Sequence, residues 1–220
     1  MNFCDKRKYV SGEAHPTLIR YIESRGYEPV LLDPLAEVDS PIAAHADIQM
    51  CRLGCRDDSP VIRAAADELV LMSGSYPCDV PFNAAATGSF FVHRLELTSP
   101  RLLAAAQSLG MEMIDVRQGY AKCSIVVVDE NSIITYDRGI AAACEGKLDV
   151  LLIRPGHINL PGYDTGFIGG CTGRLGDEII FNGKLSAHPN GDAMRGFIEE
   201  RGLLCTAVGD YPLTDIGSII

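Results

Sequence analysis

Apolar and polar positions along the chain repeat one pattern, in which a helix-start signal is followed by a short apolar strand. The clearest copies begin at His15, Ser59, Ser99 and His188, and a shorter copy without proline begins at Arg138. Proline suits the first helical position because its missing N–H would have no partner there, and a serine before it suits the N-cap. The pattern predicts five helices.

The spacing of these signals indicates an internal repeat. Pro16, Pro60, Pro100 and Pro189 are separated by 44, 40 and 89 positions, and one fifth of the 220 residues is 44. Self-similarity at a fixed period is the signature of a repeat architecture. Three of the helices end near a glycine that can adopt the left-handed cap conformation, namely Gly26, Gly110 and Gly202.

Extended segments complete each repeat. Residues 87–97, 123–137 and 177–184 are rich in β-branched and aromatic side chains, and the last two are interrupted by Asp-Glu-Asn and Asn-Gly. Such runs are typical of strands, and such interruptions are typical of hairpin turns. The predicted unit is therefore helix, strand, loop and hairpin, and several such units must pack on one another to bury their apolar faces.

The two ends of the chain complement each other. The first 14 residues precede any helix, whereas the last segment ends with a strand, a loop and half a hairpin. Joining them completes a fifth unit, so we expect a single α/β domain over 1–220, a five-fold pseudosymmetric α/β propeller closed by pairing of the N- and C-terminal segments. The expected units are 15–58, 59–98, 99–137, 138–187, and 188–220 joined with 1–14.

Composition fits one globular domain, since 47% of residues are hydrophobic and 22% are charged. The sequence has no continuous apolar stretch of the roughly 18 residues that a membrane span needs. The first residues include basic side chains but no apolar segment of a signal peptide. We therefore expect a cytoplasmic protein with no membrane partner.

Charge and cysteine content narrow the function classes. With 19 basic and 29 acidic residues the net charge is −10, which disfavours nucleic acid and suits a cationic small molecule. The eight cysteines include no CxxC pair, so neither a zinc site nor a disulfide framework is expected. We expect no metal and no cofactor.

Reactive or polar side chains occupy one equivalent position in every unit. In a closed ring, the residue that opens the second extended region of each unit should point toward the centre. The aligned positions hold Asp47, Asn83, Cys123, Cys171 and Asp215. In the second unit Asp79 fits the alignment as well as Asn83 does.

His45 and Asp47 form an H-x-D pair at the expected start of a strand. Residues two apart on an extended strand face the same side, so both could contact one ligand. The alternative is that the two side chains satisfy local backbone groups. Lys122, beside Cys123, is expected to face solvent because adjacent strand residues point in opposite directions.

These features together resemble the pentein fold of the guanidino-group-modifying enzymes. That superfamily includes arginine and agmatine deiminases, dimethylarginine hydrolase and the amidinotransferases. His45-x-Asp47 is similar to their GHxD segment, and Cys123, preceded by Gly119, looks like their nucleophilic cysteine. Those enzymes carry the nucleophile near the C-terminus, whereas 97 residues follow Cys123 here, so the match implies a circular shift of the units. The chain looks closest to uncharacterised bacterial proteins with that fold.

The resemblance implies roles for the aligned residues. Cys123 would be the nucleophile and His45 the acid/base, with a substrate cation held by Asp47, Asp215 and the second-unit candidates Asn83 and Asp79. Cys171 is the alternative nucleophile, because flanking glycines free its backbone to approach a ligand and nearby N–H groups could lower its thiol pKa. Cys171, however, lies three units from His45, whereas the enzymes place the nucleophile two units away.

The predicted function is that of a cysteine-dependent hydrolase or transferase. The thiolate would attack the central carbon of a guanidinium or amidinium, giving a covalent thiouronium-type intermediate, and His45 would protonate the leaving amine and then activate water. Two alternatives stay open: a non-catalytic ring that binds a partner, like the pentein-fold translation initiation factor, and a small-molecule-binding protein without turnover. A homodimer also stays open.

Overall fold

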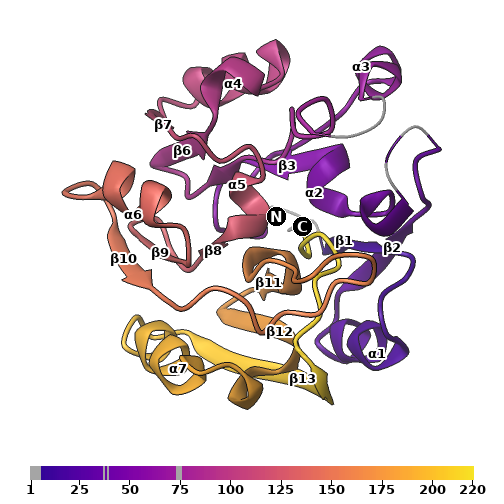
Figure 1. Cartoon of the computed structure of the whole chain (residues 1–220), viewed down its shortest axis with the longest axis vertical. Helices are drawn as coiled ribbons and strands as arrows, with labels where there is room; N and C mark the ends of the chain where they lie inside the picture. Colours follow the sequence, from indigo (N-terminus) through magenta and orange to yellow (C-terminus); the bar gives the residue numbers. More distant parts are fainter. Residues whose placement is uncertain (1–5, 37, 39, 73–75) are drawn as a thin grey trace.

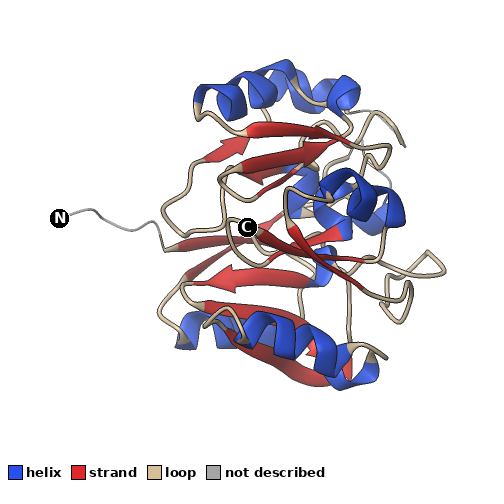
Figure 2. Cartoon of the chain, turned by 90° about the vertical axis from the view of Figure 1, so that its left-hand side faces the viewer, coloured by secondary structure: helices blue, strands red, loops and turns tan. Residues whose placement is uncertain are grey.

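Thirteen strands form five small sheets in the part of the chain that the computed structural model describes, residues 6–36, 38, 40–72 and 76–220. Figure 1 shows the sheets arranged around the centre of the molecule, with the longer helices on the outside. The side view in Figure 2 shows strands lying inside these outer helices. The fold is therefore mixed α/β, with the strands near the middle.

Three of the sheets share one connection order. The first two strands are antiparallel, a helix follows the second strand, and the third strand runs parallel to the second. The first of these sheets contains β5 (Ala85–Ala86), β6 (Phe90–His93) and β7 (Glu112–Asp115), with α4 (Pro100–Ser108). The second contains β8 (Ile125–Val127), β9 (Ser132–Thr135) and β10 (Asp149–Leu152), with α6 (Arg138–Cys144). The third contains β11 (Thr172–Leu175), β12 (Glu178–Lys184) and β13 (Leu204–Pro212), with α7 (Gly191–Glu199).

The remaining two sheets each contain two strands. β1 (Arg7–Ser11) and β2 (Glu28–Leu32) are parallel and connected through α1 (Pro16–Ser24). β3 (Met50–Arg52) and β4 (Val61–Arg63) are antiparallel and are followed by α3 (Ala66–Leu71).

The C-terminal segment lies beside β1. The backbones of Tyr9 and Ile220 exchange two hydrogen bonds, of 2.6 and 3.1 Å. On its other side, the Ile219 N–H donates to the Thr172 carbonyl at 2.9 Å. The last residues therefore connect the first sheet to the sheet of β11, and the N- and C-terminal segments pair.

Short helical turns occupy the inner ends of the sheets. α2 (Ala46–Gln49) precedes β3, α5 (Ala121–Ser124) precedes β8, and the 3₁₀ turn η3 (Gly169–Cys171) precedes β11. Figure 1 places α2 and α5 near the centre of the molecule. The other 3₁₀ turns are η1 (Ser40–Ile42), η2 (Leu95–Leu97) and η4 (Leu185–Ala187).

Several sequence signals for helices are confirmed. His15 Nδ1 accepts from the Thr17 N–H at the start of α1, and Ser99 Oγ accepts from the Leu102 N–H at the start of α4. α6 begins at Arg138 as predicted, capped by Asp137, whose carboxylate accepts from the next turn. Gly26, Gly110 and Gly202 have positive φ angles of 81°, 75° and 72°, as expected for left-handed caps.

Two predicted helix starts and one predicted turn are wrong. The segment after Ser59 forms β4, where β-branched Val61 and Ile62 pair with β3, and α3 begins at Ala66. The last helix begins at Gly191 rather than at His188, whose Nδ1 instead accepts from the Asn190 N–H. The predicted Asn-Gly turn is instead part of β12. A Cβ on Gly183 would lie 2.4 Å from the Pro212 carbonyl oxygen of the neighbouring strand. There glycine permits close strand approach instead of a turn.

The sheets also group the elements differently from the predicted units. Each three-stranded sheet joins a hairpin to the helix and strand that follow it, whereas the predicted units join a helix and strand to the next hairpin. Apolar clusters lie between the sheets and outer helices, as where Leu102 and Ala106 of α4 are fully buried. Among the described residues, no helix has the length and apolar character needed to cross a membrane.

Candidate functional site

Four of the five aligned sequence positions lie just before the first strand of a sheet, and the fifth precedes the C-terminal residues beside β1. Asp47 is in α2 ahead of β3, and Asn83 precedes β5. Cys123 is in α5, Cys171 ends η3, and Asp215 precedes the C-terminal residues that flank β1. The repeat therefore brings five turns to the centre, and the side chains on those turns decide the local chemistry.

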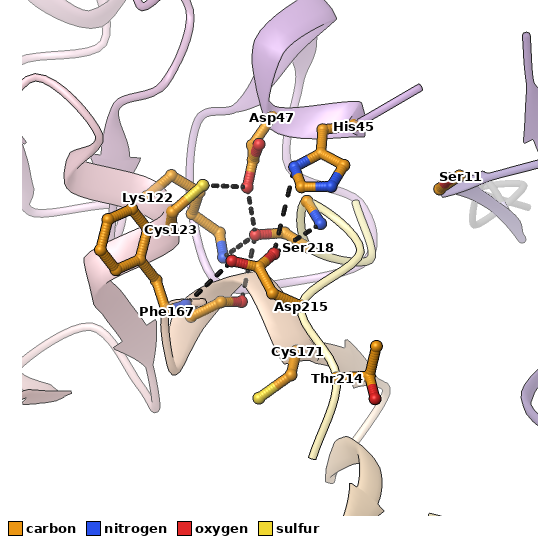
Figure 3. Close-up of polar contacts among 12 residues, drawn as sticks. Ser11, His45, Asp47, Lys122, Cys123, Phe167, Cys171, Thr214, Asp215 and Ser218 are labelled. Atoms are coloured by element: carbon orange, nitrogen blue, oxygen red, sulfur yellow. Dashed lines mark hydrogen bonds and ion pairs between the residues drawn. The ribbon is translucent and has the colours of Figure 1, made fainter. Parts of the chain in front are cut away.

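The thiol of Cys123 contacts two polar side chains from other sheets. Its Sγ donates to Asp47 Oδ2 at 3.0 Å and accepts from Asn83 Nδ2 at 3.2 Å. Asn83 Oδ1 also accepts from the Cys123 N–H at 3.1 Å. The Asn83 amide therefore fixes both the backbone and the sulfur of Cys123, while Figure 3 shows the sulfur directed at the Asp47 carboxylate.

Asp47 is a fully buried carboxylate with an unused acceptor. Its Oδ2 also accepts from the Ser218 hydroxyl at 2.7 Å, whereas Oδ1 has no hydrogen-bond partner among the described residues. Burial raises the pKa of Asp47, and the nearby Asp215 carboxylate raises it further. An unpartnered buried oxygen is costly, and such atoms are found where a ligand or a catalytic role explains them.

Asp215 is held by the backbone of two loops. Its Oδ2 accepts from the Phe167 N–H and its Oδ1 from the Gly217 N–H, both at 2.9 Å. Burial raises the pKa of Asp215 to about 6, although these two hydrogen bonds oppose the shift. A Cβ on Gly170 would lie 2.0 Å from Asp215 Oδ1, so glycine is required for this carboxylate to pack there.

His45 shares the same centre. It caps the start of α2, and its Nδ1 lies 4.0 Å from Asp215 Oδ1. Burial lowers the pKa of His45, which favours the neutral imidazole at pH 7. The backbone at Gly217 passes directly against this side chain, since a Cβ there would lie 2.1 Å from His45 Cβ. The imidazole is therefore held against the turn that carries Asp215.

Lys122 and Ser218 extend the polar network. Lys122 Nζ donates to Ser218 Oγ at 3.0 Å, and the same hydroxyl contacts Asp47 Oδ2 (Figure 3). The expectation that Lys122 faces solvent is wrong, because residues 121–124 form a helical turn in which strand alternation does not apply. Ser218 has a positive φ of 67°, a backbone conformation that is rare outside glycine. Strained backbone of this kind is found at functional sites.

A pocket opens above these side chains. His45, Cys123 and Asp215 provide its polar lining. The walls are mainly apolar and aromatic, formed by Ile42, Ile48, Tyr120, Leu160, Tyr163 and Phe167. An apolar pocket with a few convergent polar groups is typical of a small-molecule site.

Comparison with protein-family models supplies a relationship for this chain. A model described as a family of unknown function (DUF6873) matches residues 9–220. The chain belongs to this family. The match includes every residue of the site described above, from His45 to Ser218. Neither the curated proteins nor the solved structures contain a significant match to the chain.

Two other candidate residues of this DUF6873 member lie outside the pocket. Cys171 is fully buried in an apolar cluster, and its thiol donates to the Ile168 carbonyl at 3.0 Å. Figure 3 shows its sulfur directed away from the Cys123–Asp47 pair. Asp79 accepts from the Tyr120 hydroxyl at 2.6 Å, so it positions a wall of the pocket from behind. Of the two second-unit candidates, Asn83 is the one that contacts the thiol.

Sequence reasoning missed Ser218 and the aromatic wall. Ser218 follows Asp215 by three residues, and Tyr120 and Phe167 each follow a glycine, but none of these signals is specific. The glycines before Cys171 also have another explanation. A Cβ on Gly169 would lie 2.2 Å from the Lys122 carbonyl oxygen, so Gly169 and Gly170 let η3 pack against α5 and Asp215.

Proposed function

We propose that the protein is a cysteine-dependent hydrolase or transferase acting on the central carbon of a guanidinium or amidinium. The observation that carries the proposal is the Cys123 thiol, hydrogen-bonded to the buried Asp47 carboxylate at the base of a pocket shared with His45 and Asp215. His45 and Asp47 come from one segment, Cys123 and Asp215 from two others, and Asp47 lies against the thiol while the other three line the pocket. Together they supply the groups that this reaction class requires.

The proposal includes the fold, a pentein-like five-fold pseudosymmetric propeller. Supporting it, three sheets share one connection order, and pairing of Tyr9 with Ile220 adds an antiparallel neighbour to β1. The segments that carry Asp47, Asn83, Cys123 and Cys171 each precede the first strand of a sheet, and Asp215 precedes the residues that lie beside β1. In this arrangement the site occupies the centre of the ring, where residues from different units meet.

The two carboxylates would hold the cation. Asp47 Oδ1 is unpartnered among the described residues, and Asp215 lines the pocket. A planar amidinium presents N–H groups to both through charge-assisted hydrogen bonds. Its positive charge also offsets the unfavourable proximity of two buried carboxylates, which raises the pKa of Asp47. The net charge of −10 favours the approach of a cation.

The thiol would become nucleophilic when that cation binds. Burial raises the pKa of Cys123 well above its ordinary value, and the charges of Asp47 and Asp215 raise it further. The free protein therefore holds a neutral thiol. A substrate cation beside the sulfur has the opposite effect, because it stabilises the thiolate. The neutral His45 imidazole at the same pocket base is available to take the thiol proton.

The reaction then proceeds in two halves. Cys123 Sγ bonds to the amidino carbon, and the carbon–nitrogen bond breaks as His45 returns its proton to the leaving amine. Water, or an acceptor amine in a transferase, adds to the thiouronium carbon and gives a proton to His45. The carbon–sulfur bond breaks, the product leaves, and the thiolate recovers that proton. No electrons are gained or lost overall.

Alkylation with a matched pair of reagents tests this function. The cationic reagent is 2-chloroacetamidine, its neutral counterpart is 2-chloroacetamide, and adducts are located by peptide mass. Cys78 is exposed and serves as an internal reference. The cation should modify Cys123 at least about tenfold faster than Cys78, since charge-assisted hydrogen bonds are worth 1.5–3 kcal/mol, whereas the neutral reagent should prefer Cys78.

The other outcomes are equally informative. Preferential amidine labelling of Cys171 would transfer the nucleophilic role to that residue. Labelling of Cys78 alone by both reagents would contradict the enzyme proposal and would favour a binding ring without covalent chemistry.

A further inference from the structure

The pocket that contains Cys123 separates charge from apolar surface. His45, Cys123 and Asp215 converge on its polar end, where Asp47 lies beneath the thiol. The remaining lining is apolar or aromatic, apart from the Thr165 hydroxyl at the exposed edge. A ligand held by its cation at the polar end would therefore direct the rest of its structure along an apolar wall.

The aromatic part of that wall is continuous and begins at the carboxylate. Phe167 donates its backbone N–H to Asp215, and its ring stacks on Tyr136 with centroids 5.7 Å apart. The Tyr120 ring lies 6.0 Å from that of Phe167 and is oriented by the hydrogen bond to Asp79. An alkyl or aryl group attached to a bound amidinium would bury apolar surface against the Phe167 and Tyr120 rings, which line the pocket, whereas Tyr136 only packs on Phe167.

The pocket offers no counterion for an acidic tail. Of the ten described residues that line it, none is a lysine or an arginine. Lys122 is close in sequence, but its Nζ donates to Ser218 and its side chain lines a different pocket. Burying a carboxylate without a paired cation is strongly unfavourable. An amino-acid substrate would also bring its carboxylate toward the acidic groups that hold the amidinium.

We propose that the ligand is a monosubstituted guanidine or amidine with an uncharged apolar tail, and that guanidino acids such as arginine are rejected. This inference rests on the proposed function for the placement of the cation. With the cation at the polar end, the tail lies against the aromatic wall, and this placement favours an apolar tail. The missing lysine or arginine, and not the size of the pocket, excludes the acids.

Calorimetric titration of the wild-type protein tests the preference directly. The matched ligands are n-pentylguanidine and 5-guanidinopentanoate, which have five-carbon chains and differ by a terminal carboxylate, with arginine as a third ligand. The neutral-tail compound should bind about tenfold or more tightly than either acid. Equal or tighter binding of 5-guanidinopentanoate or arginine, or no binding by any of the three, would overturn the inference.

This measurement is separate from the test of catalysis. Tight binding of n-pentylguanidine without selective alkylation of Cys123 would leave the tail preference supported and contradict the enzyme proposal. Selective alkylation of Cys123 combined with tighter binding of arginine would support the enzyme proposal and contradict the tail preference.

A charge added at the edge of the pocket tests the reason for the preference. Thr165 is exposed there, and among the described residues its hydroxyl hydrogen-bonds to the backbone carbonyls of Ile158 and Gly166. Thr165→Arg supplies the missing cation, and Thr165→Gln is the control of similar length without charge. The affinity ratio of 5-guanidinopentanoate to n-pentylguanidine should rise about tenfold in the arginine variant relative to the glutamine variant. An unchanged ratio would show that the missing cation does not set the preference.

Discussion

The turns that carry Cys123 and Cys171 occupy equivalent places and have different surroundings. Each lies immediately before the first strand of a three-stranded sheet, and both thiols are buried. Cys123 is hydrogen-bonded to Asp47 and Asn83, which lie in the segments ahead of two other sheets, and it lines a pocket. Cys171 is bonded to the carbonyl of Ile168, three residues earlier in its own turn, within an apolar cluster.

The difference shows that position in the repeat does not by itself make a cysteine reactive. Burial raises the pKa of both thiols, so neither is a thiolate in the free protein. Of the two cysteines, only Cys123 lines the pocket, where a bound cation would lower the pKa of its thiol. Its neighbours, and not its own turn, decide whether the thiol can do chemistry, because those neighbours bind the charge that would activate it.

Removing each sulfur gives the largest expected contrast. Cys123→Ala should abolish the fast alkylation by 2-chloroacetamidine and leave only the slower alkylation of Cys78, and it should reduce any turnover of n-pentylguanidine by roughly 10³-fold or more, because the nucleophile is lost. Cys171→Ala should preserve both activities and lower the free energy of unfolding by about 1 kcal/mol, because it removes only core packing. Adduct mass, amine release and urea denaturation measure these effects. If folded Cys171→Ala loses activity as completely as Cys123→Ala, the comparison is wrong.

Removing the charge beside Cys123 should have the next largest effect. Asp47→Asn retains the size of the side chain but lacks the carboxylate that would hold the cation. Alkylation of Cys123 by 2-chloroacetamidine should slow about 10- to 100-fold. Alkylation by 2-chloroacetamide should become faster, because the Asp47 charge no longer raises the pKa of the thiol.

The matched control is Asp164→Asn, which makes the same change in net charge at an exposed position. It should leave the ratio of the two alkylation rates near that of the wild type. A parallel fall in both rates for Asp47→Asn would indicate a structural role for Asp47 and would contradict its role in holding a cation.

The smallest expected effect concerns Asp215. It should appear in how the free energy of unfolding depends on pH. Burial raises the pKa of Asp215 from 3.8 to about 6. Between these values the folded state binds more protons than the unfolded state, so this group stabilises the fold at low pH and loses that contribution as pH rises. The free energy of unfolding of the wild type, minus that of Asp215→Asn, should fall by about 2 kcal/mol from pH 4 to pH 7.

Urea denaturation across this pH range measures the difference. Asp164→Asn, the same change of side chain at an exposed position, is measured beside it as the control. A rise with pH for Asp215→Asn would mean that the folded protein stabilises the ionised carboxylate, contrary to its burial.

Local signals in the sequence predicted much of the framework. Serine and histidine caps located α1 and α4, because capping depends on neighbouring residues. Alignment of the repeats selected Asp47, Asn83, Cys123 and Asp215, which the structure brings together around one thiol and its pocket. The helix expected after Ser59 failed because pairing with β3 overrides the helical preference of that segment.

The sequence could not separate Cys123 from Cys171. Both follow glycines and precede the first strand of a hairpin. The deciding partners of Cys123 lie 76 and 40 positions away in Asp47 and Asn83. Likewise, the direction of Lys122 depends on a helical turn and on Ser218, 96 positions later. Such contacts are set by the tertiary fold, and a single sequence has no local pattern that reports them.

The hydrogen bond between Ser218 and Asp47 has a consequence for the order of folding. It joins residues 171 positions apart, and Cys123 between them must be in place for the thiol to meet the carboxylate. Contacts with such long sequence separation close large loops and form slowly. The acidic pocket should therefore appear only as the whole chain reaches its native arrangement, so a partly folded molecule holds the thiol without the carboxylates that direct it to a cation.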